Sequence, residues 1–260
     1  MDPRPGGRSR VHHDGPRTTA TGEKGVTRAL SHPSIVRYPL LSPLSSFALA
    51  LRLHAITLAD VAPEPSDGDA AVLASVAVRG VPFRELSAIV SETGAFSLDD
   101  LTPADIDVHR RIVDATFRRA TVLPAPVGVV FRTPDILKRW MELHYVSLNG
   151  ALQFVEDRAV ARVHIVRSDG RDDDLEAGSD LAAAAAEAFR ALRRRSVAAV
   201  PLRLEEVTGL VLSASFLVER DLWKEFLAAV GEQHEAHGLL RFDVTGPWAP
   251  YDFVQMQFGG

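Results

Sequence analysis

The sequence predicts an α+β fold of two domains, the C-terminal one ferredoxin-like, behind a disordered N-terminal tail. The tail, residues 1–45, lacks apolar periodicity and is rich in Gly, Pro, Arg and Ser, a composition typical of disorder. Beyond it, strand-like segments of period two are mixed with helix-like segments. The second half runs strand, helix, strand, strand, helix, strand, which is the βαββαβ order of ferredoxin-like domains. We therefore assign 46–155 to an N-terminal α+β domain and 156–260 to a C-terminal ferredoxin-like domain with a returning final strand.

Four apolar segments predict the strands of the N-terminal domain, with proline and glycine marking the loop between the first two. These segments are 47–56, 72–78, 86–91 and a central one at 121–131.

Two helices of this domain begin with the same signal. Thr102 and Pro103 predict an N-cap and a first helical position, with Asp105 at the positive end of the helix. Thr133 and Pro134 repeat the pattern. The predicted helices cover 103–119 and 134–152.

In the second half the alternating segments predict four strands, at 159–166, 198–204, 210–218 and 239–245. Ser179 and Asp180 are expected to cap a helix that ends near Arg195, and Asp221 to begin one that ends near His237. Residues 251–256 alternate once more, and we expect this extra strand to return to the first sheet or to lie along the domain boundary.

Composition limits the function. The chain has no cysteine, which excludes disulfide scaffolds, thiolate zinc sites and cysteine nucleophiles. It has neither an apolar run of about 20 residues nor the apolar segment of a signal peptide, so a cytoplasmic location is expected. The net charge of −5 combines +4 in residues 1–37 with −9 in the rest. An acidic body argues against nucleic-acid binding.

The basic tail has two interpretations. In the first, the start codon is assigned too early and the tail is not part of the protein. In the second, the tail is an arm that touches an acidic partner. We favour the first because the tail lacks a block of five or so like charges, which would indicate an interaction arm.

Few residues suggest chemistry. His234 and His237 are spaced to share a metal, although two histidines also complement the C-terminal end of a helix. The run 172–174 is acidic but lacks the ligand spacing of a calcium loop, so a solvated connection is the simpler interpretation. The basic cluster 193–195 suits a helix C-terminus, and a contact with an acidic partner stays open. We expect no catalytic residue, no metal and no cofactor.

The segment 244–254, Val-Thr-Gly-Pro-Trp-Ala-Pro-Tyr-Asp-Phe-Val, combines turn residues with large aromatic side chains. Gly246 and Pro247 predict a reversal of the backbone, and Pro250 fixes a second position. Trp248 is expected to anchor a corner or a partner surface. If it is buried, Trp248→Ala costs about 3 kcal/mol or more.

This ending resembles that of the gas vesicle protein F/L family (GvpL/GvpF). Three further segments agree in order: 121–131 is similar to the central Leu-Pro-x-x-x-Gly-x-Val-Phe strand of the family, 212–220 to the strand before its last helix, and 85–91 to an early strand. The chain is identified as a member of this family. It is a divergent one, because Pro126 stands where the family commonly has an arginine. The motif residues carried over are Leu123, Pro124, Gly128, Phe131, Gly246, Pro247, Trp248, Pro250, Tyr251 and Phe253.

The resemblance implies a non-enzymatic gas vesicle protein, either an assembly factor or a minor structural component. Its implied partners are the major gas vesicle shell protein and other gas vesicle accessory proteins, with no nucleic acid and no membrane. Its implied location is the gas vesicle within the cytoplasm. The alternative is a ferredoxin-like module that binds a small ligand or regulates another protein. The third hypothesis is an enzyme. It is the least favoured of the three, because no nucleophile, base and orienting group can be named together.

Overall fold

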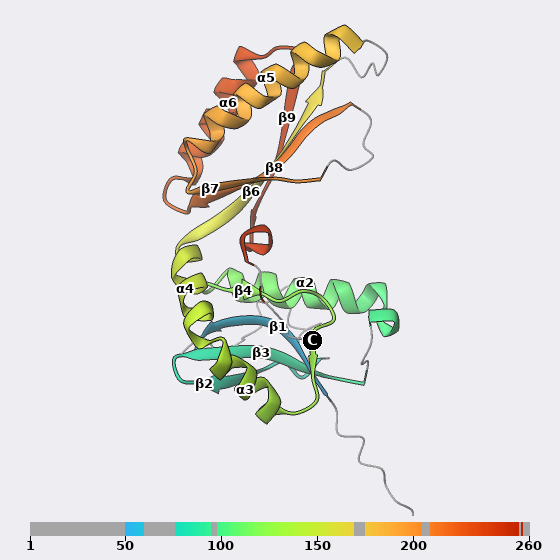
Figure 1. The fold of residues 1–260 in the computed structure, drawn as a ribbon, viewed down its shortest axis with the longest axis vertical. Coiled ribbons are helices and arrows are strands. Elements are labelled where there is room, and N and C mark those ends of the chain that lie inside the picture. The colour runs from blue at the N-terminus through green and yellow to red at the C-terminus, as the bar shows by residue number, and fades with distance from the viewer. Residues whose placement is uncertain are drawn as a thin grey trace, which may run out of the picture. The chain divides into compact units, whose positions relative to one another are not determined.

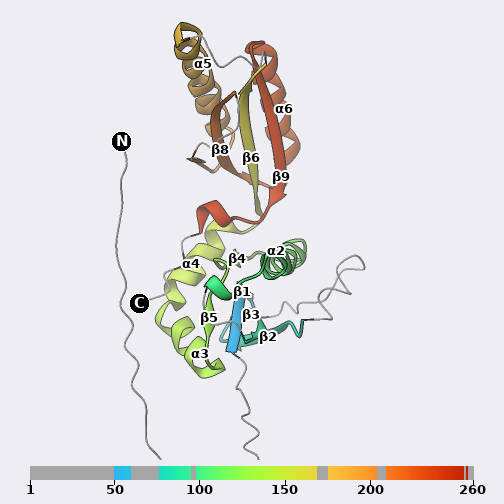
Figure 2. The same ribbon diagram turned by 90° about the vertical axis from the view of Figure 1, so that its right-hand side faces the viewer.

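The structure is a computed structural model that describes residues 50–59, 76–94, 98–168, 175–203, 209–254 and 256, with only the helical backbone given for 175–179. The chain forms a mixed α+β fold with two antiparallel sheets (Figures 1 and 2). The predicted disordered tail, 1–45, and the acidic run 172–174 lie outside the described residues.

The first sheet has the order β2-β3-β1-β4, with β5 also paired to β1, and its strands pair antiparallel. Its strands are β1 (Ala50–Leu58), β2 (Arg79–Phe83), β3 (Leu86–Thr93), β4 (Leu123–Pro124) and β5 (Val130–Phe131). The predicted strands at 47–56 and 86–91 correspond to β1 and β3. Every residue of β1 except Leu58 is buried, including the polar Arg52 and His54.

Two strand predictions in this half were wrong. Residues 76–78, the described part of the predicted strand 72–78, are turn and coil, and the strand there is β2, which starts at Arg79. The predicted strand 121–131 is interrupted between β4 and β5. Pro126 lacks the N–H that a continuous ladder requires, and Gly128 turns the chain at a positive φ of 89°.

The helices of the first half are η1 (Leu98–Asp100), α2 (Pro103–Phe117), α3 (Pro134–Leu143) and α4 (Tyr145–Val155). Thr102 and Asp105 form a reciprocal capping box at the start of α2. The predicted helix 134–152 is divided in two because His144, at φ −103° and ψ 8°, leaves the helical conformation.

The second sheet has the order β7-β8-β6-β9. Its elements are β6 (Arg158–Arg167), α5 (Leu175–Arg193), β7 (Ala198–Pro201), β8 (Leu210–Glu219), α6 (Trp223–Ala236) and β9 (Leu240–Trp248). This βαββαβ connectivity with antiparallel neighbours confirms the ferredoxin-like prediction. Helices α5 and α6 cover the same face of the sheet (Figure 1).

Two predicted boundaries and one predicted strand in this half were wrong. Helix α5 begins at Leu175, so Ser179 and Asp180 lie inside it instead of capping it; leucine, glutamate and alanine in its first turn extend the helix upstream. Strand β7 ends at Pro201, which has no N–H for the ladder. Residues Tyr251–Phe253 form a short 3-10 helix, η2, in place of the predicted strand.

The η2 turn follows from its flanking residues. Pro250 has φ −80° and ψ 48°, and the N–H groups of Tyr251 and Phe253 donate to Ala249 O and Pro250 O at 2.8 and 3.1 Å. These local bonds use the groups that a strand would offer to a neighbour. The expected return to the first half is nevertheless present as packing, because Val254 and Met256 contact the core of the first sheet.

Residues Ser46–Gly260 form one compact unit that contains both sheets. Each sheet has its own apolar core, and a third cluster combines Ala55, Ile89 and α2 residues with Ala159 and Ala249. Arg220, after β8, adds a polar link: it lies 4.2 Å from the Phe117 ring centre and donates to Phe117 O at 3.1 Å.

Candidate interaction surface

The C-terminal motif turns the chain at the end of β9. Gly246 has a φ of 133°, and a Cβ placed there would lie 2.6 Å from Val160 O and 3.0 Å from Trp223 Cη2. Only glycine fits this position without a backbone shift. The Gly246–Pro247 peptide bond is cis, and Ala249 and Pro250 are buried beyond it.

Trp248 is 41 % exposed, and its Nε1 donates to Thr245 Oγ1 at 3.1 Å. The indole that packs beneath the corner is instead Trp223, which contacts two of the apolar clusters. The condition for a large loss of stability in Trp248→Ala is therefore not met.

The rest of the motif is anchored by polar contacts. Asp252 accepts from Arg162 Nε and Nη2, both at 3.1 Å, and from Ser215 Oγ at 2.5 Å. Tyr251 packs on the cluster formed with α2, and burial, with Asp114 nearby, raises the pKa of its phenol. Phe253 is half-buried. These residues hold the end of the chain in place.

The central motif residues lie in the first core. Leu123 is fully buried and pairs with Ile56, and Pro124 pairs with Ala55. The Phe131 ring packs at a tilt against Trp140, with the ring centres 5.6 Å apart. The structure therefore spreads the ten motif residues over the first core and the C-terminal turn, and does not bring them together in one site.

Sequence reasoning missed a buried histidine pair in the first sheet. His54 Nδ1 and His109 Nδ1 are 3.0 Å apart; His109 Nε2 lies 3.1 Å from Ala125 O, and His54 Nε2 lies 2.8 Å from Ser91 Oγ. A carbonyl oxygen only accepts, so His109 Nε2 carries its proton, His54 Nδ1 donates to His109 Nδ1, and Ser91 donates to His54 Nε2. With both rings neutral every bond is satisfied, whereas two protonated rings would each carry a proton on Nδ1 and lose the bond between them.

The surroundings favour that neutral state. Burial, then the charges of His109 and Arg52, lowers the pKa of His54 to about 3. Burial lowers the pKa of His109 to about 4, although the hydrogen bond to Ala125 O acts to raise it. Arg52 is itself paired with Asp105 at 2.7 Å. Because both rings are at most 1 % exposed, the pair ties β1, α2 and the β4 segment together and offers no surface to a substrate.

A row of polar residues crosses the face of the second sheet that lies opposite α5 and α6. Ser213, His164 and Asp243 lie opposite one another in the register, with Ser213 Oγ 3.1 Å from His164 Nδ1. These are the residue types of a catalytic triad. The carboxylate of Asp243 is bound by Arg241 instead, at 2.8–3.2 Å, so the row does not have triad geometry.

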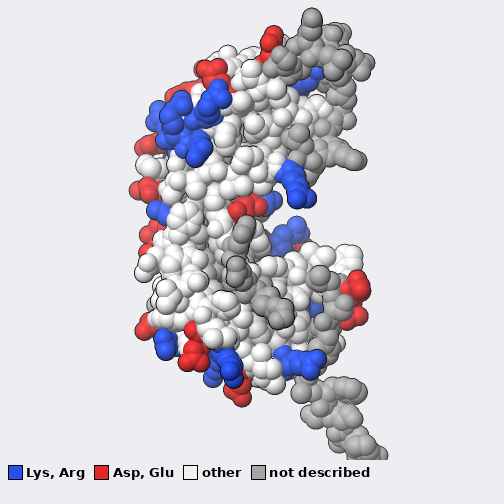
Figure 3. Space-filling view, viewed as in Figure 1, with Lys and Arg blue, Asp and Glu red and all other residues white. Residues whose placement is uncertain are grey.

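Several exposed apolar side chains lie on α3 and α4. Leu143 is 75 % exposed, Val146 82 % and Phe154 42 %. Gly150 lies between the last two at helical spacing and has open space above its Cα. Helix α4 has no charged residue along its length, and the surface over it is mostly white in Figure 3. We call Leu143, Val146, Gly150 and Phe154 the α4 stripe. The sequence could have indicated this stripe, because Tyr145–Val155 contains no charged residue.

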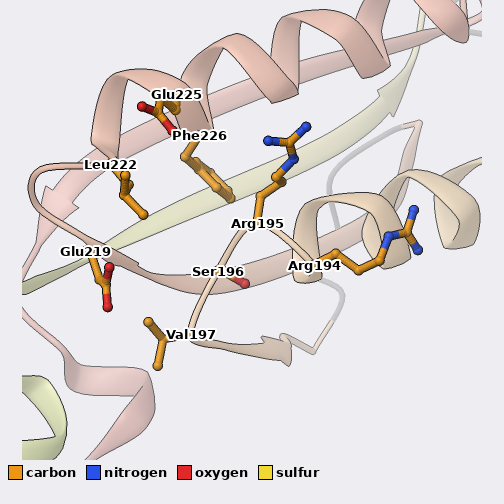
Figure 4. A pocket seen from close by; sticks show the side chains of 8 residues that line it. All are labelled: Arg194, Arg195, Ser196, Val197, Glu219, Leu222, Glu225 and Phe226. Carbon is orange, nitrogen blue, oxygen red and sulfur yellow. The ribbon is translucent and has the colours of Figure 1, made fainter.

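Two hollows lie at the ends of the second sheet. One, of about 280 Å³, is lined by Val197, Leu222 and Phe226, with Arg195, Glu219 and Glu225 also on its wall (Figure 4). Since both signs of charge line it, it favours neither an anion nor a cation. The other, of about 380 Å³, lies between α5 and the turn into β9. Figure 3 also shows basic side chains over the end of α5, where Arg190 and Arg193 complement the helix dipole.

Of the two histidines that are spaced to share a metal, His234 has other partners. His234 Nδ1 lies 3.1 Å from Leu240 O and its ring packs on Phe242, while His237 is the residue after α6. In the described ranges no group of three metal-binding side chains comes together. No helix in the part of the chain that the structure describes has the length and apolar content needed to cross a membrane.

These features define an α+β protein with a ferredoxin-like half, a tied-down C-terminal turn and an exposed apolar helix face. Residues 53–178 and 167–255 match the family model for the gas vesicle synthesis protein GvpL/GvpF. The chain belongs to the GvpL/GvpF family.

Individual relatives agree. Gas vesicle protein F of Haloferax mediterranei is 31 % identical over 183 residues, which cover 69 % of this chain and 82 % of that protein. Gas vesicle protein F2 of Halobacterium salinarum is 28 % identical, over 69 % and 81 %. The crystal structure of GvpF from Anabaena sp. PCC7120 superposes with a TM-score of 0.63 at 17 % identity, covering 82 % of this chain and 98 % of that one. GvpF from Microcystis aeruginosa gives 0.59 at 16 %, covering 80 % and 100 %. The fold and a gas vesicle role are therefore shared.

Proposed function

We propose that this protein acts in gas vesicle formation as an assembly factor or minor structural component that binds the shell protein and other accessory proteins without catalysing a reaction. Membership of the GvpL/GvpF family supports the gas vesicle role. The α4 stripe supports the binding role and carries the proposal.

The stripe has the properties of a docking surface for an apolar helix. Contiguous exposed apolar residues on a protein that is otherwise well packed mark sites of association. Val146 and Phe154 rise on either side of Gly150, which lacks a side chain, so a partner helix can approach the backbone closely there. Helix α4 itself carries no charge, and Arg158 lies over the Phe154 ring at 5.6 Å. Docking at Val146 and Gly150 therefore requires no ionic group of the helix to be dehydrated.

A co-purification experiment tests this role. The full chain is expressed with the major shell protein and the accessory proteins of the same organism, and bound shell protein is measured after mild purification. Val146→Glu places a charge on the stripe at a position that is 82 % exposed, so folding should be unaffected. We expect it to reduce bound shell protein about tenfold or more.

The matched control is Ile106→Glu, since Ile106 is also an exposed apolar residue of a helix, α2, at 48 % exposure. This variant should bind as the wild type does. Equal loss in both variants would remove α4 as the surface, and absence of binding by the wild-type chain would overturn the proposed role itself.

One observation favours the ligand-binding alternative. The hollow of about 380 Å³ has apolar walls from Leu181, Ala184 and Leu239 with Arg167 and Asp180 beside them, and its size is that of a small ligand site. A ligand at saturation should raise the free energy of unfolding by about 2 kcal/mol or more. A metabolite screen by thermal shift that finds no such compound would count against this alternative.

A further inference from the structure

The edges of the two sheets differ in how they are protected. Strand β2 contains Pro82 and β7 contains Pro201, and proline in an edge strand blocks pairing because it has no N–H. Strand β9 is the other edge of the second sheet. It has no proline from Leu240 to Gly246. Of the edges that these three strands form, β9 is the one without proline over most of its length, and among the described residues no further strand pairs with it.

The register shows which backbone groups face outward. Arg167 pairs with Leu240 and Arg162 with Thr245, and Ser168 N–H donates to Leu239 O at 2.9 Å. Hydrogen-bonded pairs alternate in an antiparallel ladder. The N–H and C=O groups of Phe242 and Val244 therefore point away from β6, toward the open edge.

We propose that a second copy of this chain occupies that edge, with the two β9 strands antiparallel and Phe242 opposite Phe242 of the second copy. In this register Phe242 N–H donates to Phe242 O of the second copy, and Val244 N–H donates to its Leu240 O, each bond occurring twice. Leu240 O already accepts from His234 at 3.1 Å, and a carbonyl has a second lone pair for the new bond.

Charge selects this register over its neighbours. Arg241 of one copy lies opposite Asp243 of the other, and the reverse pair forms on the far side of the two-fold axis. Opposite charges on facing residues stabilise strand pairing, and like charges destabilise it. A two-fold axis at Asp243 would place the two aspartates opposite each other. An axis at Val244 would leave Arg241 opposite Pro247.

The register sets how much of the edge is covered. Thr245, whose hydroxyl holds the half-exposed indole of Trp248, lies at the end of the paired stretch. Pairing covers the backbone edge from Leu240 to Val244, and the two sheets become one continuous sheet. Nothing in this pairing depends on the gas vesicle role.

Sedimentation of the full chain over a range of concentrations tests the pairing. We expect a species of twice the 28.3 kDa chain mass at high concentration. Asp243→Lys and Arg241→Glu each place like charges opposite one another, and each should weaken the dimer about tenfold or more. The double variant Arg241→Glu/Asp243→Lys restores opposite charges across the axis and should restore the dimer.

Two further variants complete the test. Val244→Pro removes an outward N–H without touching the ladder to β6, and should give a monomer. Arg111→Glu reverses an exposed charge on α2 and should leave the dimer intact. Thermal unfolding of every variant identifies any that fails to fold. A monomer at all concentrations, or a dimer that the single reversals leave unchanged, would overturn the proposal.

Discussion

The buried histidine pair makes the stability of this protein dependent on pH in a window that can be calculated. The pKa of His54 is lowered to about 3 and that of His109 to about 4, from 6.5 for each. At a pH between the folded and the unfolded pKa values, the folded state therefore binds fewer protons than the unfolded state. A group of this kind stabilises the fold at neutral pH, and that contribution is lost as pH falls below 6.5.

The magnitude follows from the size of the shifts. For each histidine that stays neutral in the folded state, the free energy of unfolding falls by about 1.4 kcal/mol for each unit of pH below 6.5. Between pH 7 and pH 5 the free energy of unfolding should therefore fall by about 2 kcal/mol for each ring and by about 4 kcal/mol for the pair. The pKa of Asp105, held at about 2 by Thr102 and then Arg52, lies below this window. Its contribution is lost only at more acidic pH.

Urea denaturation at pH 7, 6 and 5 measures the effect, with the free energy of unfolding extrapolated to water at each pH. His109→Gln keeps a donor for Ala125 O and removes one titrating ring, so its loss between pH 7 and 5 should be about half that of the wild type. A wild-type loss below about 1 kcal/mol, or an equal loss in the variant, would refute the reasoning.

Two further predictions concern the C-terminal turn and are measured by thermal unfolding. Gly246→Ala should cost about 2 kcal/mol or more, because its Cβ would lie 2.6 Å from Val160 O at a φ of 133°; Gly238→Ala, with open space around it, is the control, and equal midpoints would contradict the steric argument. Trp248→Ala should cost less than Trp223→Ala, since Trp248 is 41 % exposed and Trp223 contacts two apolar clusters; the reverse order would place Trp248 in the core.

The sequence predicted those elements whose signals are local. Thr102 and Thr133 cap their helices as expected, because an N-cap depends on the next three residues. The alternation in β6 and β8 gave both strands, since each buries one face under helices.

Failures came where long-range contacts or turn chemistry decided the structure. The alternation of 251–256 was real, but Pro250 and the bonds of Asp252 to Arg162 and Ser215 hold the segment as a turn. The histidine pair could not be predicted, because His54 and His109 meet only when α2 packs on β1. Trp248 was expected to anchor a corner or a partner surface, and its partial exposure depends on which of two tryptophans fills the space beside Gly246, where the structure places Trp223.

The packing of Val254 and Met256 on the first core has a consequence for synthesis. Strand β1, at the centre of that core, leaves the ribosome about 200 residues before these two side chains do. Until then the hollow lined by Trp140 and Leu148 lacks the part of its wall that Val254 and Met256 supply. The first half must therefore wait in an incompletely packed state, at the stage when exposed apolar surface most readily leads to aggregation.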